Sequence, residues 1–95
     1  MNHIWYVYIM ADHPGGLLYI GITNNLLRRV EEHKNGACNG FTKRYWMHHL
    51  VYYEIYSTPY DAIKREKQLK HWNRAWKIRL VKTENPFWKD LSEEF

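Results

Sequence analysis

The chain has little of several features that would have assigned it to a particular class of protein. It holds a single cysteine, Cys38, among 95 residues, which excludes an internal disulfide framework and a cysteine-rich zinc site. Its apolar runs are all shorter than the ~20 residues of a membrane-spanning helix, and its N-terminus does not read as a secretory leader. We therefore expect a cytoplasmic protein without membrane association.

Aromatic and basic residues are what the chain has in abundance. Phe, Trp and Tyr make up 17% of the residues, and the formal net charge is +4. One domain, residues 1–95, is the expected organisation for a chain of this length. The positive charge favours an anionic partner such as nucleic acid, and some of the rings could serve as stacking platforms for bases.

Apolar and β-favouring residues predict three strands, over Ile4–Met10, Leu17–Ile22 and Leu50–Tyr56. The turn at residues 14–16, Pro-Gly-Gly, suits a hairpin between the first two strands. The expected fold is α+β, a small three-stranded antiparallel sheet flanked by three to four helices, with its core over about residues 4–80.

The helices are expected at residues 26–34, 59–72 and 74–82. Asn24 or Asn25 can cap the first helix. Thr58 can cap the second, with Pro59 in its first turn. The spacing of the third helix predicts that Trp76 faces inward, and residues 93–95 are expected to fray.

Five side chains have chemistry suited to phosphodiester hydrolysis. Tyr8 and Tyr19 carry phenols that can relay a proton, and Arg29 presents a planar guanidinium that fits phosphate oxygens. His33 titrates near neutral pH, and Glu66 supplies a carboxylate that could hold one Mg²⁺ with the help of water and phosphate oxygens.

Each of these residues also has a purely structural interpretation. Tyrosines are common in strands, arginines on helix surfaces are commonly solvated, and His33 lies favourably at a helix end. Glu66 can pair with Lys70 one turn later. His48 and His49 are adjacent, so on a strand they would point to opposite faces, which argues against a zinc site.

Two short segments resemble the motifs of the GIY-YIG nuclease family, in particular its small stand-alone bacterial members. Residues 6–8, Tyr-Val-Tyr, stand in the place of the first motif, and residues 19–21, Tyr-Ile-Gly, match the second. The family's active-centre positions fall on Tyr8, Tyr19, Arg29, His33 and Glu66. Asn85 is a candidate for a late asparagine that many members use. The sequence departs from the family at Tyr6, in place of glycine, and at Ile22, where repair relatives have lysine.

This resemblance implies an endonuclease or nickase that hydrolyses DNA phosphodiester bonds with Mg²⁺ or Mn²⁺ held by Glu66. Branched or damaged DNA is among the candidate substrates. The five active-centre side chains are expected to converge on one concave face of the sheet. Two other functions stay open from the residues alone: a nucleic-acid-binding module that does not cleave, and a small protein-interaction domain.

Basic side chains outside this set are expected to contact the phosphates of the nucleic acid in a sequence-independent way. They are Lys43, Arg44, Lys64, Lys67, Lys70, Arg74 and Lys77.

Overall fold

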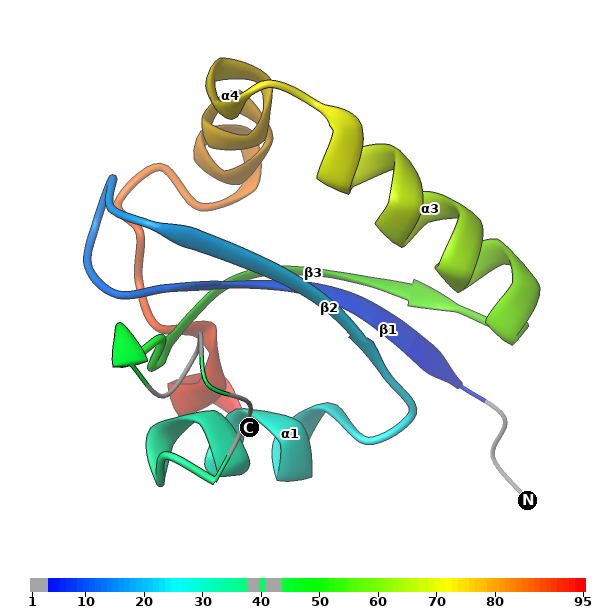
Figure 1. Cartoon of the computed structure of the whole chain (residues 1–95), viewed down its shortest axis with the longest axis horizontal. Helices are drawn as coiled ribbons and strands as arrows, with labels where there is room; N and C mark the ends of the chain where they lie inside the picture. The colour runs from blue at the N-terminus through cyan, green and yellow to red at the C-terminus, as the bar shows by residue number, and fades with distance from the viewer. Residues whose placement is uncertain (1–3, 38–39, 41–43) are drawn as a thin grey trace.

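A computed structural model of the chain describes residues 4–37, 40 and 44–95. The sheet has three antiparallel strands, β1 (Trp5–Ala11), β2 (Leu18–Thr23) and β3 (His49–Tyr56), in the order β2-β1-β3 (Figure 1). Residues 7–11 of the central strand β1 are all buried, as the apolar composition of this segment predicts. The predicted α+β fold and the three strands are confirmed, with bounds that differ by about one residue.

Helices cover both faces of the sheet (Figure 1). One face is covered by α1 (Leu26–Lys34) and the 3₁₀ helix η1 (Leu91–Glu94). The other face carries α3 (Pro59–His71) and α4 (Arg74–Glu84). Among the described residues, no helix is both long and apolar enough to cross a lipid bilayer.

The helices begin where side chains can accept from otherwise unbonded backbone N–H groups. The side chain of Asn25 accepts a hydrogen bond from the N–H of Arg28 at 3.1 Å. Thr58 does the same for the N–H of Asp61 at 3.3 Å. These two caps are among those predicted from the sequence, and they fix the ends of α1 and α3 that lie near the sheet.

Side chains of the strands alternate between two hydrophobic cores. Val7 and Ile9 pack with residues of α3 and α4, whereas Tyr8 and Met10 pack with Leu26 and other residues of the α1 layer. This alternation determines which strand residues face α1 and which face α3, and it directs the phenol of Tyr8 toward α1.

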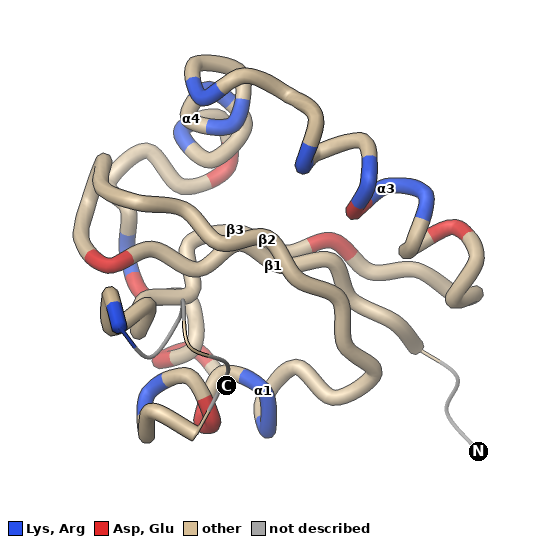
Figure 2. Tube along the Cα trace, viewed as in Figure 1, with Lys and Arg blue, Asp and Glu red and all other residues tan. Residues whose placement is uncertain are grey.

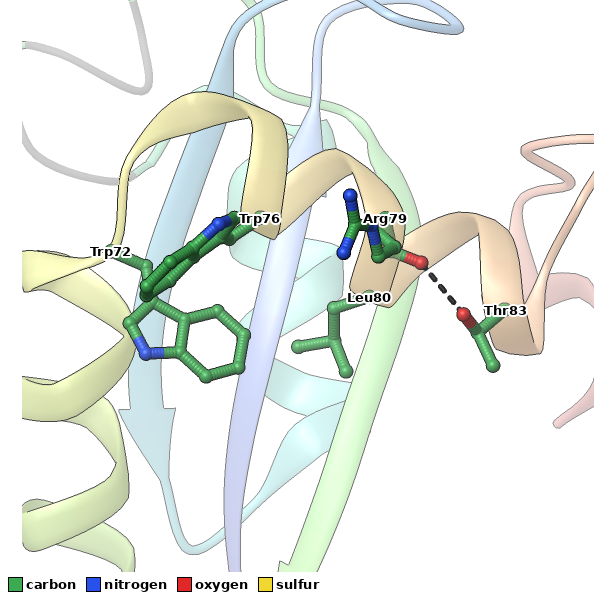
Figure 3. Close-up of a pocket in the computed structure, with 5 residues that line it drawn as sticks. All are labelled: Trp72, Trp76, Arg79, Leu80 and Thr83. Carbon is green, nitrogen blue, oxygen red and sulfur yellow. Dashed lines mark hydrogen bonds between the residues drawn. The ribbon is translucent and has the colours of Figure 1, made fainter.

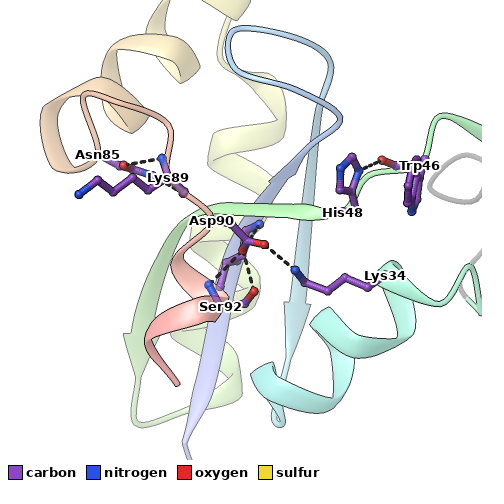
Figure 4. Close-up of polar contacts among 8 residues, drawn as sticks. Lys34, Trp46, His48, Asn85, Lys89, Asp90 and Ser92 are labelled. Atoms are coloured by element: carbon purple, nitrogen blue, oxygen red, sulfur yellow. Dashed lines mark hydrogen bonds and ion pairs between the residues drawn. The ribbon is translucent and has the colours of Figure 1, made fainter.

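The C-terminal segment is attached to β3 by polar side chains (Figure 4). Asp90 accepts hydrogen bonds from Lys34 Nζ at 2.5 Å and from the N–H of Leu50 at 3.2 Å. The Nδ2 group of Asn85 donates to the carbonyl oxygens of Val51 and Lys89, at 3.1 and 2.9 Å. Asn85 thus closes the turn after α4, where it is buried.

Two expectations about the helices were wrong. Trp76, expected to face inward, is 51% exposed. Residues 91–94 form η1 although fraying was expected at residues 93–95, because the Asp90 carboxylate caps this short helix through the N–H and hydroxyl of Ser92.

Candidate active site

A cavity of about 270 Å³ lies at the edge strand β2. Its lining consists of Tyr8, Tyr19, Gly21, Ile22, Arg29, His33, Ala37 and Glu66. All five side chains that the sequence singled out for phosphodiester chemistry are therefore in one place, and the sixth candidate, Asn85, lies elsewhere. We expected these side chains to converge on one face of the sheet, and this expectation was wrong. Glu66 belongs to α3 and His33 to α1, and these two helices cover opposite faces (Figure 1).

Tyr8 and His33 form a buried hydrogen bond inside this cavity. The hydroxyl of Tyr8 is 3.0 Å from Nε2 of His33. The ring of Tyr19 lies 5.4 Å from that of His33 and 6.3 Å from that of Tyr8, measured between centroids. The three rings form one compact group, so a change in the position of any one ring would move the other two.

His33 is held in its neutral form. Burial lowers the pKa of its imidazole, and the positive charge of Arg29 lowers it further, to about 4. A neutral imidazole carries one N–H, and its Nδ1 has no hydrogen-bond partner among the described residues. At neutral pH, His33 is therefore suited to orient the Tyr8 hydroxyl and to exchange one proton with it.

Gly21 provides the space that the Tyr8 ring occupies. A Cβ atom placed on Gly21 would lie 2.5 Å from Cζ and from the hydroxyl oxygen of Tyr8. Tyr8 is only 2% exposed and has little room to move away. Tyr8 and Gly21 are partners in the pairing of β1 with β2. The ring of Tyr8 therefore requires a residue without a side chain at position 21.

Arg29 and Glu66 supply charges of opposite sign to the cavity. Arg29, half-buried on α1, has Glu32 as an ion-pair partner, with 3.4 Å between Nη1 and Oε1. The Glu66 side chain is 15% exposed, and Nζ of Lys70 lies 3.5 Å from its Oε2. Within the part of the chain that the structure describes, Lys70 is the partner of this carboxylate, and it is itself half exposed.

The donor set at this cavity fits a hard divalent cation that keeps most of its water. In the described ranges, no three His, Cys, Asp or Glu side chains are grouped so as to enclose a metal ion. Mg²⁺ does not need such a cage, because one or two carboxylates, water and phosphate oxygens satisfy it. Glu66 is the carboxylate in the cavity that could contribute to such a site.

A second charged cluster, which the sequence analysis did not identify, joins β3 to α3. The carboxylate of Glu54 accepts hydrogen bonds from the hydroxyls of Tyr52 and Tyr56, at 2.5 and 2.6 Å. Arg65 donates to the same carboxylate through Nε and Nη2, each at 3.0 Å. Two tyrosines at two-residue spacing on either side of a strand glutamate place three polar groups on one face, which is the signal that could have revealed the cluster.

The residues expected to contact phosphate lie in several environments. Lys64 and Lys67 are exposed on α3. Arg74 is also exposed, and its Nη2 donates to the carbonyl oxygens of Gly15 and Gly16 at 2.6 Å. The guanidinium of Arg44 lies 5.6 Å from the ring centroid of Tyr45, and Lys70 is the ion-pair partner of Glu66. Lys77 is half-buried, and Lys43 lies outside the described residues.

The late asparagine of the sequence analysis is not among the residues of the cavity. Asn85 lies at the end of α4, and both of its donated hydrogen bonds go to backbone carbonyls, while its Oδ1 accepts from the N–H of Lys89. These bonds give Asn85 a structural function in the turn.

Comparisons with known proteins identify the family of this fold and cavity. Residues 4–79 match the model of the GIY-YIG catalytic domain. UPF0213 proteins of Staphylococcus aureus, among them those of strains Mu3 and N315, are 38% identical over 81 residues, covering 85% of this chain and 95% of theirs. No solved structure gives a significant match. The chain belongs to the GIY-YIG family, whose nucleases act on nucleic acid and typically depend on a divalent metal ion.

Proposed function

We propose that this protein is a metal-dependent endonuclease or nickase that hydrolyses DNA phosphodiester bonds at the β2-edge cavity. The observation that carries the proposal is the convergence of two phenols, a neutral imidazole, a guanidinium and a carboxylate on one polar cavity of about 270 Å³. Such a set can orient a water molecule and stabilise charge at a phosphate. The bacterial relatives and the lone Cys38 are in keeping with action in the cytoplasm.

The roles of the side chains follow from their contacts. Water would attack phosphorus and the bond to the leaving oxygen would break. The water would give its proton to the oxygen of Tyr8, with the phenol of Tyr19 nearby to assist, and Tyr8 would pass its own proton to Nε2 of His33, while the leaving oxygen would take up a proton from solvent. His33 would fix the Tyr8 hydroxyl through the 3.0 Å hydrogen bond and exchange its proton. Arg29 would bind the phosphate oxygens and stabilise the charge that builds up on them.

Glu66 would hold the cation together with water and phosphate oxygens. A bound Mg²⁺ or Mn²⁺ supplies a Lewis acid that stabilises negative charge on the phosphate and on the leaving oxygen. Lys70 would move away from Glu66 at little energetic cost, because an exposed ion pair at this spacing contributes about 0.3–0.5 kcal/mol.

Cleavage assays with matched variants test this proposal. A supercoiled plasmid and short single-stranded, duplex and branched DNAs would be incubated with Mg²⁺ or Mn²⁺, and in parallel with EDTA. We expect cleavage that EDTA abolishes, and a loss of at least about 10²–10³-fold in Glu66→Gln. Glu84→Gln, which removes an exposed carboxylate at the end of α4, should cleave like the wild type.

Two results would contradict the proposal. If no substrate is cleaved with either metal ion while DNA is bound, the protein is a binding module on the same scaffold. If Glu66→Gln cleaves as well as the wild type, the activity belongs to another site.

A further inference from the structure

The net positive charge of the chain is concentrated on one side of the sheet. Helices α3 and α4 together carry eight Lys and Arg residues against three Asp and Glu residues. The whole chain has a net charge of only +4, so the residues outside α3 and α4 together carry a slightly negative net charge. Figure 2 shows this concentration of basic residues on α3 and α4. A polyanion is thereby attracted to the α3–α4 layer in preference to the α1 layer.

An aromatic groove of about 310 Å³ lies in this basic layer, where α3 passes into α4 (Figure 3). Its lining consists of Trp72, Trp76, Arg79, Leu80 and Thr83. Trp72 and Leu80 pack against the core beneath α3 and α4. The Trp76 indole is 51% exposed and lies edge-on to that of Trp72, with 5.8 Å between the ring centroids and an angle of 87°.

The backbone of Trp76 and the indole of Trp72 are held in place before any ligand arrives. The backbone N–H of Trp76 donates to the Asn73 side chain at 2.9 Å, in the first turn of α4. The guanidinium of Arg65 covers Trp72 at 5.1 Å from the ring centroid. These contacts limit the conformational freedom that would be lost when a flat ligand stacks in this groove, which favours binding.

Arg79 gives the groove an available positive charge. In the part of the chain that the structure describes, its guanidinium has no hydrogen bond or ion pair, and its backbone carbonyl accepts from the hydroxyl of Thr83 at 2.8 Å. The groove therefore combines an exposed indole with a guanidinium on the same helix face. A nucleotide has the matching combination of a flat base and an anionic phosphate.

We propose that this groove is a subsite for one unpaired base of a nucleic-acid strand, which stacks on Trp76 while its phosphate binds Arg79. The concentration of basic residues selects a polyanion over an apolar peptide as the occupant. A base within a duplex cannot enter the groove, because its faces are covered by its neighbours. The subsite therefore favours single-stranded or locally unpaired nucleic acid.

The distance between the groove and Glu66 has a consequence for substrate choice, and this consequence rests on the proposed function. Glu66 lies five residues before the end of α3 at His71, a rise of about 7.5 Å at about 1.5 Å per helical residue, and Trp72 follows directly. Successive nucleotides of one stacked strand are about 3.4 Å apart. A strand cleaved near Glu66 would reach the groove within about three nucleotides, so the subsite would select substrates with an unpaired base at that distance.

Binding in EDTA tests the subsite without any requirement for cleavage. The probes are fluorescently labelled oligothymidylate, the same oligonucleotide with abasic sites, and a blunt duplex, each measured by anisotropy at one salt concentration. Alanine substitution of a stacking aromatic weakens single-strand binding by about 5- to 150-fold, which is the loss expected for Trp76→Ala on oligothymidylate. Duplex and abasic binding should change little, and Trp76→Phe should retain most of the affinity.

Phe87→Ala is the matched control, since this ring is 80% exposed outside the groove. It should bind oligothymidylate like the wild type. Unfolding of each variant by urea verifies that it is folded. If Trp76→Ala is not folded, Trp76→Phe is compared with the wild type instead.

Three results would overturn the subsite: equal affinity of Trp76→Ala and the wild type for oligothymidylate, equal losses on single strand and duplex, or equal binding of abasic and base-containing strands. These results are distinguishable from failure of the proposed function. A wild-type protein that never cleaves but binds single strands through Trp76 would contradict the nuclease activity alone. Cleavage without any contribution from Trp76 would contradict the subsite alone.

Discussion

Glu54 and Glu66 are two glutamates whose side chains are equally exposed, at 15%, but whose surroundings differ. Glu54 receives hydrogen bonds from two tyrosine hydroxyls and from the Arg65 guanidinium. Glu66 faces a polar cavity, and Lys70 at 3.5 Å is its partner among the described residues. The carboxylate of Glu54 is therefore occupied by hydrogen bonds from the protein, whereas that of Glu66 can still bind a ligand.

The difference between the two glutamates indicates that one stabilises the fold and the other is available for chemistry. Burial raises the pKa of Glu54, but the hydrogen bonds from Arg65, Tyr52 and Tyr56 outweigh it, and the pKa is lowered overall. Glu54 therefore stays charged and joins β3 to α3. Because Arg65 is adjacent to Glu66 in the sequence, the same cluster holds the helix that carries Glu66 to the cavity.

The largest expected effect comes from the arginine of the cavity. Arg29→Ala removes the guanidinium that would stabilise charge on the phosphate, and loss of one such donor lowers the cleavage rate by about 10²–10³-fold. The measurement is the initial rate of plasmid nicking under saturating metal. Arg28→Ala, which removes the exposed neighbouring charge, should have a small effect. Equal losses in the two variants would mean that general charge attraction explains both.

Next in size is the effect of breaking the Glu54 cluster. Arg65→Met keeps most of the side-chain volume but leaves the Glu54 carboxylate without its positive partner. We expect the free energy of unfolding to fall by about 2–4 kcal/mol, because a largely buried charge loses its compensation. Urea denaturation measures this change. Lys64→Met at the exposed neighbouring position should stay within about 0.5 kcal/mol of the wild type.

His33 should make stability depend on pH within a defined window. Its pKa is about 4 in the folded protein and 6.5 when unperturbed, so the unfolded chain binds more protons between these values. Stability should therefore fall as the pH is lowered from 6.5 to 4, by up to roughly 3 kcal/mol from this residue. Other groups titrate in the same range, so the wild type is compared with His33→Gln at each pH. A difference that is constant with pH would contradict the low pKa.

Gly21→Ala should have a smaller effect on folding. The added methyl overlaps the Tyr8 ring, and overpacking of this kind costs about 1–3 kcal/mol. Gly40→Ala is the control, because a Cβ atom there meets nothing within 4 Å. If both substitutions leave stability unchanged, the Tyr8 ring is free to move and the close β1–β2 contact is not a constraint.

Local signals in the sequence were sufficient to predict the elements of the fold. The apolar strands, the caps Asn25 and Thr58, and Pro59 at the start of α3 are interactions within a few residues of one another, so short patterns encode them. The order of the tyrosines, Arg29, His33 and Glu66 likewise anticipated the residues that line the cavity.

Interactions between distant segments were not predictable in this way. Nothing in the sequence indicated that Arg74 donates to carbonyls of the β1–β2 turn, 58 and 59 residues earlier in the chain, and its contact with phosphate stays a prediction. Asn85 has a structural function because it meets Val51 across the fold. The approach of Glu66 to β2 from the opposite helix layer and the exposure of Trp76 also depend on how the helices pack, which periodicity alone does not determine.

The central claim is that Glu66 serves chemistry and Glu54 serves folding, and one paired measurement tests it most directly. Plasmid cleavage with Mg²⁺ and the free energy of unfolding in urea would be measured for the wild type, Glu66→Gln and Glu54→Gln. We predict that Glu66→Gln loses at least about 10²–10³-fold in cleavage with its stability retained. Glu54→Gln should lose about 2–4 kcal/mol of stability and, where it is still folded, keep most of its cleavage. Full cleavage by Glu66→Gln, or a stability loss in it as large as that of Glu54→Gln, would contradict the account.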